Sequence, residues 1–150
     1  MKVVIQRVLE ASVKIDGKEN GQINKGLMLL LGIAENDTQK DIDWLVRKII
    51  TMRIFNDEAG KMNKSLIDIN GEILLISQFT LQASTKKGSR PSFIKAAKPE
   101  VAIPLYQQFI ADLESNLKKP IATGIFGADM KVSLINDGPV TIIVDSENKV

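Results

Sequence analysis

The pattern of apolar and polar positions changes most sharply in residues 71–82, which read Gly-Glu-Ile-Leu-Leu-Ile-Ser-Gln-Phe-Thr-Leu-Gln. Residues 73–76 are apolar on both alternating faces, which predicts a central strand that is covered on two sides. The strand then becomes polar at Ser77, Gln78 and Thr80 without a Gly or Pro. Polar groups at this place often bind a ligand, but they can also simply end a strand.

Shorter patterns predict the rest of a sheet. Residues 2–15 are rich in Val and Ile, Asp16-Gly17 is typical of a tight turn, and residues 21–23 suggest a short return strand. The apolar run 26–32 begins and ends with glycine and predicts a second buried strand. We also expect a short strand at 52–55.

The carboxyl-terminal part has two further apolar segments, 132–135 and 140–144, which we predict to be two strands. Asp137-Gly138 between them favours a tight hairpin turn, although an ordinary turn fits as well. Gly138-Pro139 admits a cis peptide bond, which would fix the backbone carbonyls in an unusual direction.

Two stretches have helical spacing. After the capping residues 36–38, with Asp41 three positions beyond Thr38, apolar residues recur on one side through Ile50. A second helix is expected to begin at Pro99, or only at Pro104, and to end before Pro120. Its apolar stripe includes Tyr106 and Phe109, which we interpret as core residues.

These elements predict an α/β chain of the α+β type. We expect one domain over residues 1–150, with a mixed, mostly antiparallel β-sheet or open barrel and two main helices packed on it. Residues 146–150 are expected to be a loose tail. The sequence has no apolar run that suits a membrane span or a signal peptide, so we expect a cytoplasmic protein.

Among 150 residues there is no Cys and no His. Ser-His-Asp and Cys-His nucleophile systems are therefore excluded, as are zinc sites made of imidazole or thiolate. Asp57 and Glu58 are adjacent, but no second acidic cluster would complete a site for a hard cation. We expect no metal and no cofactor. Proton transfers would depend on carboxylates, Lys, Tyr106, backbone groups or the substrate.

Positive charge is concentrated in one segment although the net charge is only +2. Residues 84–99 contain five cations and no acidic residue: Lys86, Lys87, Arg90, Lys95 and Lys98. Arg90 could bind phosphate and Phe93 could stack on a base. Alternatively, the segment is a solvated loop with Phe93 in the core. Further along, Phe126 and Met130 either fill the core or line a pocket.

Two motifs together resemble the D-aminoacyl-tRNA deacylase family, formerly called D-tyrosyl-tRNA deacylases. They are Ser-Gln-Phe-Thr-Leu at 77–81 and Asn-Asp-Gly-Pro-Val-Thr at 136–141. The likeness extends over nearly the whole chain, through the segments 6–8, 11–13, 26–32, 53–55, 60–63, 88–93 and 126–130.

The resemblance implies a homodimer with active sites at the interface. Its partners would be D-aminoacyl-tRNA and Gly-tRNA(Ala), and it would hydrolyse the ester at the terminal ribose. The implied pocket floor is Ser77, Gln78, Phe79 and Thr80. The implied chirality filter, which reaches the partner's site, is Gly138 and Pro139, with Phe126 and Met130 nearby. The implied contacts to the terminal adenosine or its phosphates are Lys87, Arg90 and Phe93.

The chemistry has two possible forms. Thr80 could be a nucleophile, but no base lies next to it in the sequence, so we favour assistance by the substrate's own 2′-hydroxyl. Backbone N–H groups near Phe79 and Thr80 would stabilise the oxyanion. Two other functions remain open, a non-catalytic tRNA-binding module and a general D-amino-acid esterase.

Overall fold

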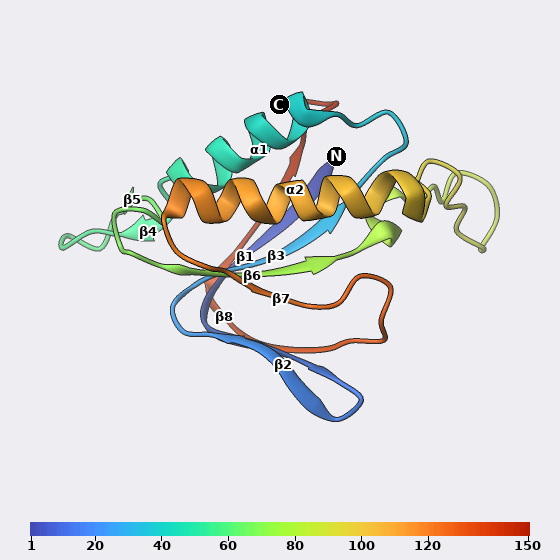
Figure 1. Ribbon diagram of the computed structural model, residues 1–150. Helices are drawn as coiled ribbons and strands as arrows, with labels where there is room; N and C mark the ends of the chain where they lie inside the picture. The colour runs from blue at the N-terminus through green and yellow to red at the C-terminus, as the bar shows by residue number, and fades with distance from the viewer.

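The computed structural model describes residues 1–150, in which a six-stranded sheet carries two helices on one face (Figure 1). The strands of this sheet are β1 (Lys2–Ile15), β2 (Lys18–Ile23), β3 (Gly26–Gly32), β6 (Glu72–Ser77), β7 (Ala122–Thr123) and β8 (Lys131–Asp145). A separate pair is formed by β4 (Phe55–Asn56) and β5 (Met62–Lys64). The helices are α1 (Gln39–Thr51) and α2 (Pro99–Leu117), with a 3₁₀ turn η1 (Phe79–Gln82) after β6.

Strand β1 organises the sheet because it pairs antiparallel with β2, β3 and β8. The order β2-β1-β3-β6-β7 continues with parallel pairs, β3 to β6 and β6 to β7. At the far end β2 comes back towards β7, and the Asn20 side-chain amide donates to the Thr123 carbonyl at 2.8 Å. The mixed sheet is therefore nearly closed as a barrel, which confirms the predicted fold.

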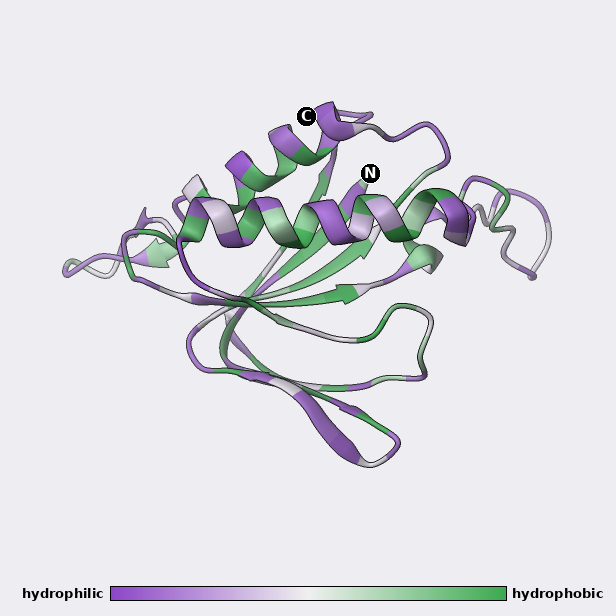
Figure 2. Cartoon of the chain, viewed as in Figure 1, coloured by the Kyte–Doolittle hydropathy of each residue, from purple (hydrophilic) through white to green (hydrophobic).

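Both faces of β3 and β6 are buried. Leu29 and Leu75 belong to the large core under the helices, whereas Met28 and Leu74 belong to a smaller core inside the curved sheet. Figure 2 shows that the strands beneath the helices consist mostly of hydrophobic residues and that the β2 hairpin is largely hydrophilic. The prediction of a central strand with two covered faces is confirmed.

The helices follow their sequence signals. Thr38 and Asp41 form a capping box, in which the Asp41 carboxylate accepts from the Thr38 backbone N–H at 2.8 Å. Helix α2 begins at Pro99 and includes Pro104, and it ends where Lys118 adopts a left-handed conformation. Neither helix is long and apolar enough to cross a membrane.

The predicted hairpin in the carboxyl-terminal part is wrong. Residues 132–135 and 140–144 belong to one continuous strand, β8, and both halves pair with β1, from Val13↔Val132 to Val3↔Val144. Register shifts near Val8 absorb the segment 136–140, so it bulges without reversing the chain.

Two boundaries also differ from expectation. The strand expected at 52–55 is reduced to β4, Phe55–Asn56, because Met52 caps α1. In the expected tail, Ser146 is buried, and its side chain accepts from the Met1 amino group at 3.0 Å while its backbone N–H donates to the Met1 carbonyl at 2.9 Å.

Candidate active site

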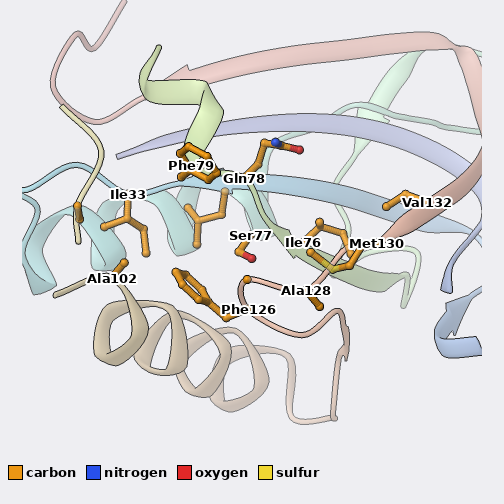
Figure 3. A pocket seen from close by; sticks show the side chains of 13 residues that line it. Ile33, Ile76, Ser77, Gln78, Phe79, Ala102, Phe126, Ala128, Met130 and Val132 are labelled. Atoms are coloured by element: carbon orange, nitrogen blue, oxygen red, sulfur yellow. The ribbon is translucent and has the colours of Figure 1, made fainter. Parts of the chain in front are cut away.

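A pocket of about 250 Å³ opens at the carboxyl end of β6 (Figure 3). It is lined by Leu31, Ile33, Ile76, Ser77, Gln78, Phe79, Ala97, Ala102, Phe126, Gly127, Ala128, Met130 and Val132. Ser77 lies in its middle, between Ile76 and Phe126. Five of the predicted site residues therefore meet in one place: Ser77, Gln78, Phe79, Phe126 and Met130.

The 3₁₀ turn η1 starts directly at this pocket. Phe79 and Thr80 are its first two residues, and the first N–H groups of a helical turn have no acceptor within it. Thr80 does not line the pocket, but its hydroxyl oxygen accepts a hydrogen bond from the Gln78 side-chain amide. The start of η1 therefore lies at the pocket, and the Thr80 hydroxyl, which is outside the lining, is hydrogen-bonded to an amide and not to a base.

The opposite wall comes from the loop between β7 and β8. Gly124 makes room for it, because a Cβ there would lie 2.3 Å from the Met130 sulfur. The Gly124 N–H donates to the Leu75 carbonyl at 3.1 Å, and the Phe126 ring packs on Tyr106 with centroids 5.7 Å apart. The interpretation of Phe126 and Met130 as pocket-lining residues is supported, and Tyr106 is in the core as expected.

No residue that lines the pocket can gain or lose a proton near neutral pH. Tyr106 packs on Phe126 of the lining, and its hydroxyl donates to the Leu75 carbonyl at 3.4 Å. Desolvation by burial raises the pKa of Tyr106 to about 12. The lining of this pocket therefore supplies no general acid or base. The chain also has no group of three or more His, Cys, Asp or Glu side chains placed to bind a metal ion.

The basic segment, residues 84–99, includes a loop beside the pocket. Ser84 and Ser92 close it with two backbone hydrogen bonds of 2.8 and 2.9 Å, and Lys87 and Arg90 are exposed in the loop between them. Phe93 is not in the core. It is 39% exposed, and its ring packs edge-on against Phe79 with centroids 5.2 Å apart.

Gly138 and Pro139 do not line the pocket of their own chain. Both are exposed on β8, and the peptide bond between them is cis. Gly138 has φ +125°, and a Cβ there would lie 2.9 Å from Nη2 of Arg7.

The sequence analysis missed Arg7 as a site residue. Arg7 is buried, and its Nε donates to the Asp137 carbonyl at 3.1 Å while Nη1 donates to the Ile54 carbonyl at 2.6 Å. The sequence carries no separate signal for it, because Arg7 stands beside Gln6 in a strand that also contains Lys2 and Glu10.

Comparison with known proteins places this geometry in a family. A family model described as D-Tyr-tRNA(Tyr) deacylase matches residues 4–145. The chain is 66% identical to the D-aminoacyl-tRNA deacylase of Flavobacterium psychrophilum and 61% identical to that of Bacteroides thetaiotaomicron, with 99% of each chain covered in both cases.

Solved structures agree. A protein named c-Myc DNA Unwinding Element Binding Protein matches with a TM-score of 0.92 at 45% identity, covering 97% of this chain and 98% of its own. A probable eukaryotic D-amino acid tRNA deacylase has the same fold, with a TM-score of 0.84 at 16% identity over 95% of this chain and 97% of its own. The chain therefore belongs to the D-aminoacyl-tRNA deacylase family, a family of hydrolases that act on aminoacyl-tRNA ester bonds.

Proposed function

We propose that this protein hydrolyses the ester between a D-amino acid, or mischarged glycine, and the 3′-terminal ribose of tRNA, and that it rejects L-aminoacyl-tRNA. The observation that carries the proposal is the pocket at the end of β6, which is lined by the Ser77 hydroxyl and the start of η1 but by no ionisable side chain. Such an enzyme would act in the cytoplasm on D-aminoacyl-tRNA and Gly-tRNA(Ala), as quality control before translation.

The proposed chirality filter is the backbone at Gly138 and Pro139. Main-chain atoms that grip the amino group and the hydrogen on Cα leave no room for a side chain in the place of that hydrogen. An L-residue would drive its Cβ into backbone that cannot repack, whereas glycine would pass because it has no Cβ. Arg7 supports this role, since it holds the Asp137 carbonyl next to the filter.

The filter would reach the pocket from a second copy of the chain. Gly138 and Pro139 are exposed and lie outside the pocket of their own chain. Their position on the surface supports a homodimer in which each subunit completes the active site of its partner.

Hydrolysis would then depend on the substrate's own 2′-hydroxyl. Thr80 is a poor nucleophile in this setting, because its oxygen accepts from the Gln78 amide, and an amide cannot take up a proton. The 2′-hydroxyl would activate water or help to expel the amino acid. The N–H groups of Phe79 and Thr80 would stabilise the oxyanion, a contribution of about 3–4 kcal/mol for a single donor in a comparable site.

The 3′ end of the tRNA would lie along the basic loop between Ser84 and Ser92. Lys87 and Arg90 are exposed and make no ion pair or hydrogen bond within the chain, so their charges are available for phosphate. Phe93 and Phe79 present aromatic surface at the pocket mouth for the terminal adenine.

The test is to incubate the protein with D-Tyr-tRNA, L-Tyr-tRNA and Gly-tRNA and to score the release of amino acid. We expect release from the D-Tyr and Gly substrates only. Binding of all three without release would indicate a non-catalytic tRNA-binding module. Turnover of D-tyrosine methyl ester at a similar rate would indicate a general D-amino-acid esterase.

A further inference from the structure

Gln82, the last residue of η1, is a polar side chain that the proposed reaction does not use. It is only 5% exposed, and its Nε2 donates to the Gly32 carbonyl at 2.8 Å. It does not line the pocket, so it has no contact with a ligand there. A buried amide that reaches across to another strand indicates a role in holding the two segments together.

At the end of β3, three successive carbonyls accept hydrogen bonds from two segments, η1 and the residues just before α2. The Leu31 carbonyl accepts from the backbone N–H of Gln78 at 2.7 Å, and the Gly32 carbonyl accepts from the Gln82 side chain. The Ile33 carbonyl accepts from the N–H of Ala97 at 3.0 Å. The first two bonds hold η1 at both of its ends, with Phe79 and Thr80 between them.

Gly32 allows the turn to approach β3 closely. A Cβ on Gly32 would lie 2.7 Å from the Leu81 Cβ and 2.9 Å from the Gln78 carbonyl oxygen. Real Cβ atoms do not come so close to such neighbours, so any larger residue would push η1 away from the strand. The two neighbours of Gly32 in the chain, Leu31 and Ile33, line the pocket, so the same contact relates η1 to the pocket wall.

We infer that Gln82 and Gly32 form a positioning clamp, that is, a pair of contacts that fixes η1 against β3. The clamp holds the backbone N–H groups of Phe79 and Thr80 close to the ester oxygen on which the oxyanion develops. The inference rests on the proposed deacylase function. Neither residue is catalytic, since both act through the placement of η1. Because a displacement of about 1 Å can cost 100-fold in rate, loss of the clamp should lower kcat with little change in KM.

The first test is Gln82→Met, which keeps the volume but removes the donor. We expect kcat for D-Tyr-tRNA to fall about 10- to 100-fold while KM stays within about threefold. Gln82→Glu has the shape of the native side chain, and its protonated carboxyl can donate to the Gly32 carbonyl. Its rate relative to the parent enzyme should therefore rise as the pH falls from 8 to about 5, whereas that of Gln82→Met should not.

Gly32→Ala tests the clamp from the other side and should lower kcat in the same way. Val46→Ala, on the buried face of α1, is the control for a general loss of stability, and its kcat should match that of the parent enzyme. Parental kcat in both Gln82→Met and Gly32→Ala would overturn the inference.

Hydrogen exchange separates this inference from the proposed function. In Gln82→Met, the hydrogen-bonded amides of Gln78, Leu81 and Ala83 should exchange faster than in the parent enzyme, with no change in α1, whether or not the parent hydrolyses D-Tyr-tRNA. Unchanged exchange would refute the clamp even in an active enzyme. An inactive parent with the expected exchange would refute only the proposed function.

Discussion

The pocket at the end of β6 is lined mainly by apolar side chains that the fold itself buries, whereas Gly138 and Pro139 are exposed on β8 and held by polar side chains. The Asn136 amide donates to Gln6 at 2.7 Å and accepts from the Val140 N–H at 3.3 Å. Arg7 donates to the Asp137 carbonyl on the other side. One region presents a shaped cavity, and the other presents a fixed piece of backbone.

This difference suggests a division of labour. In the proposed reaction, backbone N–H donors at the cavity would stabilise charge on any ester that enters it, whichever enantiomer it carries. A rigid backbone segment supplies the opposite property, because it excludes one enantiomer but contributes no reactive group. A substitution in the backbone segment should therefore change the selectivity as well as the rate, whereas a substitution at the pocket should change the rate alone.

The largest effect should come from the substrate. D-Tyr-tRNA in which the terminal 2′-hydroxyl is replaced by hydrogen should be hydrolysed about 10²–10⁴-fold more slowly, the range for loss of general-base assistance. Single-turnover release of D-Tyr measures this rate. Thr80→Ala is the matched change in the protein and should cost only about fivefold, the factor that a neutral hydrogen bond of about 1 kcal/mol gives. The reverse pair of results would make Thr80 the nucleophile.

A smaller but still large effect is expected at the filter. In Gly138→Ala the new Cβ would lie 2.9 Å from both Nη2 of Arg7 and Cγ2 of Val140, at φ +125°. The segment must shift, so release from D-Tyr-tRNA should fall about 100-fold. The ratio of D-Tyr to L-Tyr release should also fall.

Gly17→Ala is the control for this change. Gly17 also has a positive φ, +74°, but no atom lies within 4 Å of the position of its Cβ. It should lose about 1 kcal/mol in free energy of unfolding and keep the parental rate and selectivity. A Gly138→Ala variant with parental selectivity would place the filter elsewhere.

The sequence predicted the fold and the pocket well where the signal is local. The two-sided apolar run 73–76, the capping box at Thr38 and the polar step after Ile76 each depend on neighbouring residues, and all three have the predicted structure. The hairpin at Asp137-Gly138 failed for the same reason. A bulge uses the same small and turn-forming residues as a reversal of the chain, so the local sequence does not distinguish the two. The difference lies in β1, whose 14 residues are long enough to pair with both halves of β8.

Contacts between distant segments left no readable pattern. In the sequence, Gln82 is only the last residue of a polar stretch after a strand. The structure shows that its side chain donates to the carbonyl of Gly32, 50 positions away. Arg7 likewise becomes interpretable only when residues 54 and 137 lie on either side of it. Gln82 directly follows one of the two motifs and bonds it to β3, and Arg7 bonds to the backbone of the other. The sequence therefore identified the motif residues but not the residues that position them.

The smallest expected effect is that of pH on the enzymatic rate. It distinguishes this pocket from an active site that contains its own general acid and base. No lining residue titrates, and burial raises the pKa of Tyr106 to about 12, so that its phenol stays protonated and neutral throughout the range from pH 6 to 8. The ratio of the enzymatic rate to the spontaneous hydrolysis of the same D-Tyr-tRNA should therefore change less than about threefold in this range. Single-turnover rates at saturating enzyme measure the ratio. A bell-shaped ratio would mean that an ionisable side chain reaches the ester, which this pocket does not contain and the partner subunit would then have to supply.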